Sequence, residues 1–147
     1  MLPSDVERGR EIAKVLHEAF RTVGIHGKKD MPEEEPPQGA ERGSLEHILF
    51  ITLTVAIDYQ RDAGKLWDSA RSSFADPDTT YLFDPSRLHE VPRQQVRADM
   101  QKHGLSRKPR NDCNIWRTVG ITFHKKWQGD PRAFLDNCGW DALTILA

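Results

Sequence analysis

The polar residues with the clearest chemical potential lie in two short segments of the chain. The first segment is "AIDYQRD", where Tyr59, Gln60 and Arg61 follow a long apolar run. An aromatic ring, an amide and a cation at the end of a helix are suited to entering a base stack and contacting a phosphate. The simpler alternative is a corner between two helices, with Asp58 or Asp62 capping the second helix. The residues alone leave both interpretations open.

The second segment is "GLSRKPRN", which joins the stop of one expected helix to the start of the next. Its polar and cationic side chains are Ser106, Arg107, Lys108 and Arg110. These side chains, together with the backbone amides near Pro109 to Asp112, are the kind of groups that converge on a phosphate at a helix start. We therefore treat the turn as a candidate phosphate-facing elbow.

The charge around this second segment is uneven. Between residues 87 and 110 lie seven positive side chains: Arg87, Arg93, Arg97, Lys102, Arg107, Lys108 and Arg110. Against Glu90 and Asp99 they give a net charge of +5, whereas the whole chain has a formal net charge of −1. Any attraction to nucleic acid must therefore come from this local cluster, and it would be sensitive to salt. A solvated helix surface explains the same charges and remains the alternative.

Catalytic and metal-binding patterns are weak. The histidines show no HExxH or similar ligand spacing, and neither GxSxG nor a P-loop occurs. Cys113 and Cys138 form no CxxC motif, so we expect two reduced thiols and no metal site. Asp58 and Asp62 are spaced for acid/base work, but capping or surface carboxylates explain them more simply. We assign no catalytic residue and no cofactor.

Length and composition indicate a folded domain. The chain has 147 residues, with 37% hydrophobic and 29% charged residues, which suits one compact domain or a domain with a tail. No apolar run is long enough to span a membrane, and the N-terminus "MLPSDVERGR" lacks an apolar signal region. We expect a soluble, cytoplasmic protein without a membrane partner.

Helical periodicity runs through most of the chain. It predicts an amphipathic helix within residues 1–27, then an acidic, proline- and glycine-rich linker at 28–43 that we expect to be flexible. Ser44 caps a long apolar helix whose length and composition place it at the domain centre. Further helix starts and stops are marked by Asp84, Pro85, Pro92, Gly104, Gly129, Asp130 and Pro131. The pattern predicts an all-α bundle of about six to eight helices.

The run "SLEHILFITLTVAIDYQRDAGKLW" resembles the buried helix and following turn of the helix-hairpin-helix DNA glycosylases, the endonuclease III-like superfamily. In that family the turn carries a glutamine that probes DNA, and an aliphatic–aromatic pair ends the helix that follows. Leu66 and Trp67 stand where that pair would be. A simple pairing puts the glutamine near Ile57, so giving its role to Gln60 requires a shifted alignment.

The later part of the chain continues this resemblance. Gly104, Leu105 and Lys108 match a "GL" turn and the polar step that follows it, and "DPRAFLDNCGWDALTIL" is similar to the short helix before the family's glycine-rich hairpin. The hairpin with its catalytic lysine, and the later catalytic aspartate, would lie beyond Ala147. The resemblance therefore implies that residues 44–147 form the six-helix lobe of an orthogonal helical fold, truncated before the hairpin and inactive alone.

These observations give a principal and an alternative hypothesis. The resemblance implies a DNA-repair, base-excision glycosylase-like protein that binds double-stranded DNA, associates with the nucleoid, and is completed by a missing part or a second chain. The alternative is a small helical protein-interaction or dimerisation module, with the apolar end "WDALTILA" as the contact between two copies. An unrelated small enzyme that uses Asp58 and Asp62 is the third possibility.

Overall fold

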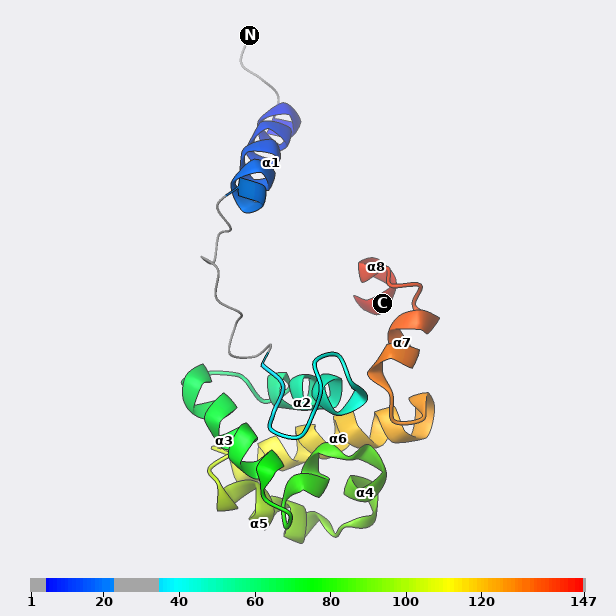
Figure 1. Cartoon of the computed structure of the whole chain (residues 1–147). Helices are drawn as coiled ribbons and strands as arrows, with labels where there is room; N and C mark the ends of the chain where they lie inside the picture. The colour runs from blue at the N-terminus through cyan, green and yellow to red at the C-terminus, as the bar shows by residue number, and fades with distance from the viewer. Residues whose placement is uncertain (1–4, 23–34, 147) are drawn as a thin grey trace. The chain divides into compact units, whose positions relative to one another are not determined.

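The structure, a computed structural model, describes residues 5–22 and 35–146 of the chain. These residues form eight α-helices and one short 3₁₀ helix, and they include no strand, which confirms the all-α prediction. The chain divides into two compact units, one up to residue 31 and one from residue 32 (Figure 1). None of the described helices is both long enough and apolar enough to cross a membrane.

The first unit contains α1 (Asp5–Thr22), within the range where the sequence predicted an amphipathic helix. Ile12, Val15 and Leu16 recur at helical spacing and are exposed. The helix stop predicted at Gly24 lies outside the described residues.

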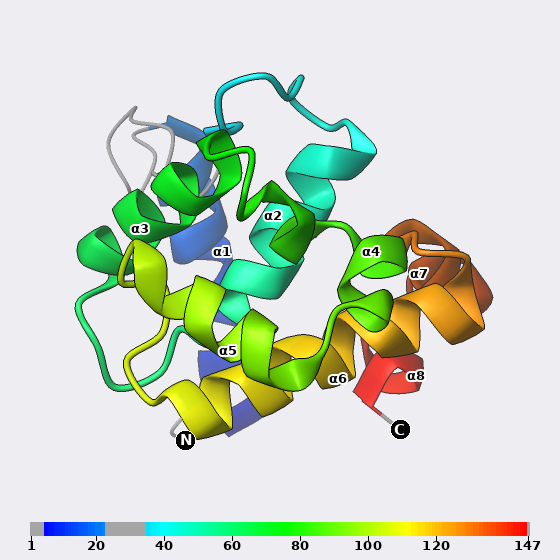
Figure 2. The same cartoon turned by 90° about the horizontal axis from the view of Figure 1, so that it is seen from below.

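The second unit holds the other helices. In chain order they are α2 (Leu45–Val55), α3 (Ala63–Ala75), η2 (Thr80–Phe83), α4 (Pro85–Glu90), α5 (Arg93–Lys102), α6 (Pro109–Trp127), α7 (Pro131–Asn137) and α8 (Ala142–Leu146). The 19-residue α6 is the longest of these, and α2, α4, α5 and α7 all contact it. Figure 2 shows α4 and α5 next to α6, and α2 packs its buried face, which includes Phe50 and Leu53, into the core of the unit.

Local sequence signals determine where these helices begin and end. The side chains of Ser44, Asp62, Asp84 and Asp130 each accept a hydrogen bond from a backbone N–H in the first turn of the following helix. After α5 the backbone reverses at Gly104, whose φ of +72° is a left-handed conformation that favours glycine. The helix caps and the stop predicted at these positions are thus present in the structure.

Part of the expected linker is packed. Residues 35–43 form turns, in which the N–H of Ala40 donates to the carbonyl of Pro37 at 3.0 Å. Pro37 is buried, and Glu35 Oε2 lies 3.8 Å from Arg71 Nη2 on α3. This half of the segment therefore belongs to the second unit, while residues 28–34 lie outside the described residues.

An aromatic cluster forms the centre of the core. Its members are Phe50, Trp67, Phe74, Phe83 and Trp116, with contacting ring centroids 5.3 to 5.9 Å apart. Tilted and edge-to-face ring pairs of this kind contribute about 0.5–1.5 kcal/mol each beyond the burial of their surface. Leu66 and Trp67, the pair that the resemblance singled out, are fully buried here and serve as core residues.

Trp116 also supplies a buried polar link between α6 and η2. Its indole Nε1–H donates to the backbone carbonyl of Leu82 at 2.7 Å, and the side chain is completely buried. The tryptophan thus satisfies a carbonyl that water does not reach, while its ring packs edge-on against Phe83.

We predict that Trp116→Phe lowers the free energy of unfolding by about 2–4 kcal/mol, because it removes this hydrogen bond and leaves space beside a smaller ring. Urea denaturation measures the change. The matched control is Trp140→Phe, because Trp140 is 63% exposed and its loss should alter stability by no more than about 0.5 kcal/mol. Equal effects of the two substitutions would contradict this account of the core.

Candidate functional site

The buried carboxylate of Asp112 joins the two turns that the sequence singled out. Its side chain is 2% exposed and lies in the first turn of α6. Oδ1 accepts a hydrogen bond from the Tyr59 hydroxyl at 2.6 Å. Oδ2 accepts three more, from Ser106 Oγ at 2.9 Å and from the backbone N–H groups of Arg107 at 2.9 Å and Lys108 at 2.7 Å. The α2–α3 turn and the α5–α6 turn therefore meet at one carboxylate.

Two further contacts connect the same turns. Arg61 Nη1 donates to the carbonyl of Leu105 at 2.8 Å, and Nη2 donates to that of Gly104 at 3.4 Å. The Lys108 ammonium lies 5.1 Å from the centre of the Tyr59 ring, within range of a cation–π interaction. We call this surface the Asp112 corner, defined by Tyr59, Gln60, Arg61, Ser106, Arg107, Lys108 and Asp112.

The corner changes the roles expected for several of its residues. Tyr59 and Arg61 have protein partners, so they hold the turns together in this structure. Gln60 is exposed and has a φ of +51°, a left-handed conformation that non-glycine residues seldom adopt. The N–H groups of Arg107 and Lys108 already point at Asp112. The exposed groups of the corner are therefore the side chains of Gln60, Arg107 and Lys108.

Ion pairs reduce the charge that the local sequence count suggested. The Lys102 ammonium lies 2.8 Å from Asp76 Oδ2 and 3.0 Å from Asp78 Oδ2, and both acids precede the counted segment. Asp76 also contacts His103 Nε2 at 2.6 Å. Hydrogen bonds from Lys102 and His103 hold the pKa of Asp76 well below its usual range. Lys102 is thus largely neutralised in place, and a net charge of +5 overstates the free charge of this surface.

Arg110 contributes to a different surface. Together with Arg93, Arg97, Cys113 and Asn114 it lines a small pocket between α5 and α6. Of the seven predicted site residues, the structure thus brings Tyr59, Gln60, Arg61, Ser106, Arg107 and Lys108 together at the corner and assigns Arg110 to this pocket.

The electrostatics of the corner favour an ionised Asp112. Burial raises the pKa of this carboxyl, but the hydrogen bonds from Tyr59, Lys108, Ser106 and Arg107 together outweigh burial and hold the pKa below its ordinary value of 3.8. The same contact raises the pKa of Tyr59, because its hydroxyl proton is held by the carboxylate. A buried anion that is fully hydrogen-bonded in this way fixes local geometry.

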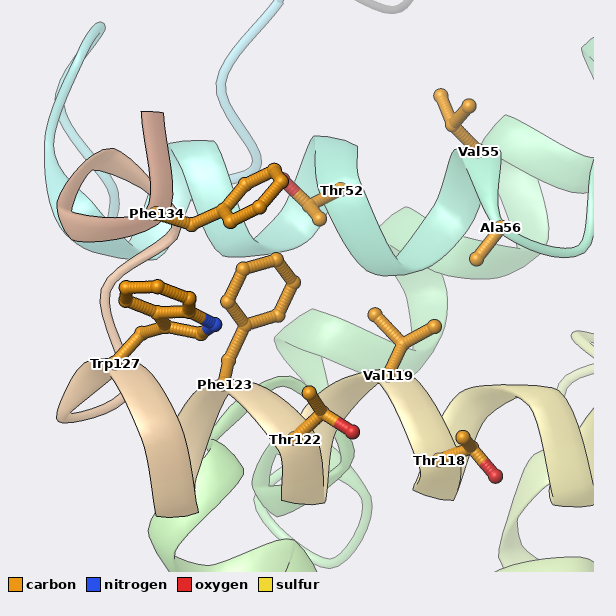
Figure 3. Close-up of a pocket in the computed structure, with 9 residues that line it drawn as sticks. All are labelled: Thr52, Val55, Ala56, Thr118, Val119, Thr122, Phe123, Trp127 and Phe134. Atoms are coloured by element: carbon orange, nitrogen blue, oxygen red, sulfur yellow. The ribbon is translucent and has the colours of Figure 1, made fainter. Parts of the chain in front are cut away.

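An apolar groove lies elsewhere on the second unit, between α2, α6 and α7. It has a volume of about 440 Å³, and Figure 3 shows Phe134 of α7 facing Phe123 and Trp127 of α6. The ring centroids of Trp127 and Phe134 lie 5.4 Å apart. At the other end of the groove is Val55 of α2, which is 54% exposed. This groove was not predicted from the sequence.

The other groups considered in the sequence are the possible metal ligands, the two cysteines and Asp62. Within residues 5–22 and 35–146, no three His, Cys, Asp or Glu side chains are grouped so that they could hold a metal ion. Cys113 and Cys138 are free thiols. Asp62 caps α3 by accepting from the N–H of Lys65 at 3.1 Å, which supports the simpler interpretation of this carboxylate.

Comparisons with protein-family models, curated proteins and solved structures found no match to this chain. The relationship to the helix-hairpin-helix glycosylases therefore stays a prediction from the residues quoted above. The roles that we propose for the corner, the groove and the pocket are therefore argued from the positions of their residues in the structure.

We predict that Asp112→Asn lowers the free energy of unfolding at neutral pH by roughly 2–3 kcal/mol, because an amide cannot accept all four hydrogen bonds. The folded-state pKa of Asp112 is depressed, so its stabilisation is complete above the unfolded pKa and is lost as the pH falls through the folded value. The difference between wild type and variant should therefore shrink below about pH 4. Denaturation at a series of pH values measures it.

The matched control is Asp68→Asn on the exposed surface of α3. It should change stability by no more than about 0.5 kcal/mol at any of these pH values. A stability difference for Asp112→Asn that stayed constant from neutral to acidic pH would show that the ionised carboxylate is not what holds the corner.

Proposed function

We propose that this chain binds duplex DNA through the Asp112 corner. The observation that carries the proposal is the junction itself, which places two turns from distant parts of the sequence on one surface. Arg107 and Lys108 are exposed on this surface, and the exposed Gln60 follows Tyr59, whose ring lies 5.1 Å from the Lys108 ammonium. Exposed cations on a turn at a helix start are suited to phosphate contacts, which position a protein on DNA without reading its sequence.

The hydrogen bonds around Asp112 support this function through preorganisation. The backbone of Arg107 and Lys108 is held by the carboxylate, so less conformational freedom is lost when their side chains meet a phosphate. Gln60 stands in a strained left-handed conformation at the exposed α2–α3 turn. Backbone strain of this kind costs about 1–3 kcal/mol and is concentrated at functional sites. In this proposal the Gln60 side chain inserts between the stacked bases of the bound duplex.

The glycosylase resemblance extends the proposal to DNA repair. In that hypothesis the second unit acts as the helical lobe that braces the duplex from which the target base is extruded. We assign no catalytic residue to this chain, and DNA binding is the activity expected of it alone.

We predict that the double variant Arg107→Glu with Lys108→Glu binds duplex DNA at least tenfold more weakly at low salt, whatever the DNA sequence. The slope of log affinity against log salt is negative, and each lost phosphate contact reduces its magnitude by about 0.9, so the magnitude should fall by about 2 for two contacts. Fluorescence anisotropy of a labelled duplex across a salt series measures both quantities.

The control variant is Lys125→Glu with Lys126→Glu, which makes the same change of charge in the last turn of α6. It should leave most of the affinity and the slope unchanged. If both double variants weakened binding equally, attraction would be a matter of net charge and the corner would not be the site. The absence of binding by the wild-type protein at low salt would also refute the proposal.

The apolar groove supports a second candidate function, association with a second copy of this chain. Its volume of about 440 Å³ lies within the range of about 300–1,000 Å³ found for binding pockets. The same unit exposes Trp140 by 63% and Leu143 by 78%, so one copy offers apolar side chains of the kind that fill a groove on another.

We predict that sedimentation velocity of the wild-type protein shows an increasing fraction of dimer as the protein concentration rises. Val55→Asp places a charge at the groove on a side chain that is already half exposed, so it should abolish the dimer without unfolding the protein. Wild-type protein that stays monomeric at all concentrations would exclude this second candidate. The DNA-binding proposal does not depend on the outcome.

A further inference from the structure

We propose that the pocket between α5 and α6 binds a phosphate group, as a phosphomonoester or the free ion. We call it the arginine pocket, and it is lined by Arg93, Arg97, Arg110, Cys113 and Asn114, with a volume of about 220 Å³. This inference goes beyond DNA binding at the Asp112 corner and does not rest on it.

Helix geometry brings the three arginines together. Arg93 and Arg97 are four residues apart on α5, and Arg110 and Asn114 are four residues apart on α6, so each pair lies on one face of its helix. The two helices contact each other (Figure 2). The pocket is therefore built from regular elements, which hold side chains more precisely than loops do.

Within the described part of the chain, the three positive charges of the pocket form no ion pair. No carboxylate lines it, and among the described residues no acid lies within ion-pair distance of the guanidinium groups of Arg93, Arg97 or Arg110. By contrast, Lys102 and Arg132 each pair with an aspartate. Arginine stays protonated at all ordinary pH values, so the pocket keeps its positive charge over that whole range.

The floor of the pocket is neutral. Cys113 is 1% exposed, and its thiol lies 3.7 Å from the carbonyl oxygen of Arg93, to which it donates. Burial raises the pKa of this thiol, although the nearby charges of Arg117, Arg93 and Arg97 act in the opposite direction. The thiol therefore supplies no competing negative charge.

The size and donors of the pocket select the ligand class. Its volume is below the range of about 300–1,000 Å³ typical of drug-sized ligands, so one small charged group fits better than a whole nucleotide. Guanidinium groups match phosphate oxygens in bidentate pairs, and the Asn114 amide adds a neutral donor. Arg110 lies in the first turn of α6, where the helix dipole also favours an anion. A phosphate dianion neutralises more of the charge of three cations than a singly charged carboxylate does.

Thermal unfolding of the full chain in inorganic phosphate, against sodium chloride at the same ionic strength, tests the proposal. Phosphate should raise the Tm in a saturable manner. Arg97→Gln should weaken the apparent phosphate affinity at least tenfold, while the Tm without phosphate is unchanged or higher because repulsion is relieved. If Arg97 only stabilised the fold, Arg97→Gln would instead lower the Tm measured without phosphate. Lys126→Gln, which removes one charge at the far end of α6, should respond to phosphate as wild type does.

A phosphate response no larger than that in chloride, or one that Arg97→Gln leaves intact, would overturn the proposal. Two short DNA single strands, one with a 5′-phosphate and one with a 5′-hydroxyl, show whether the phosphate that binds belongs to a strand end or to a small molecule. The affinity of the protein for each strand is measured. Tighter binding of the phosphorylated strand, lost in Arg97→Gln, assigns the pocket to strand ends. Equal binding of both strands, with an intact response to inorganic phosphate, assigns it to small phosphorylated molecules. The Arg107→Glu, Lys108→Glu variant should keep its phosphate response, so this proposal and the DNA-binding proposal can fail separately.

Discussion

The α2–α3 turn and the start of α6 are held together by one buried anion, the carboxylate of Asp112. Removing a charge from water is costly unless hydrogen bonds replace the lost hydration. Here four donors do so, and one of them, the Tyr59 hydroxyl, lies 53 residues earlier in the chain. Because the carboxylate needs donors from both turns, it fixes the α2–α3 turn against the start of α6.

The position of α6 then determines the other surfaces of the second unit. Trp116 inserts into the aromatic core and bonds to η2, Phe123 and Trp127 face the groove, and Arg110 lies in the arginine pocket. The corner, the groove and the pocket therefore share one helix while each uses a different part of it. Because the core fixes α6, a ligand at any of these surfaces would bind to residues whose backbone is already in place.

Much of the fold could be predicted because its signals are local. Helix periodicity, the cap at Ser44 and the stop at Gly104 each depend on a few neighbouring residues. The candidate site was predicted less completely, because its geometry depends on distant residues. A charge count along the chain included Lys102 but could not see that Asp76 neutralises it. Nothing in the sequence indicated that the Asp112 carboxylate would accept hydrogen bonds from Tyr59 and from the N–H groups of Arg107 and Lys108.

The coupling of the two turns through Asp112 is tested most directly by hydrogen exchange at the Arg107 and Lys108 amides in wild type and in Tyr59→Phe. This substitution removes one hydroxyl from the α2–α3 turn, whereas the amides observed belong to the α5–α6 turn. The account predicts slow exchange of both amides in wild type and exchange about tenfold faster in the variant, as expected for the loss of about 1.4 kcal/mol. Equal exchange in the two proteins would show that the turns are held independently and would contradict the account.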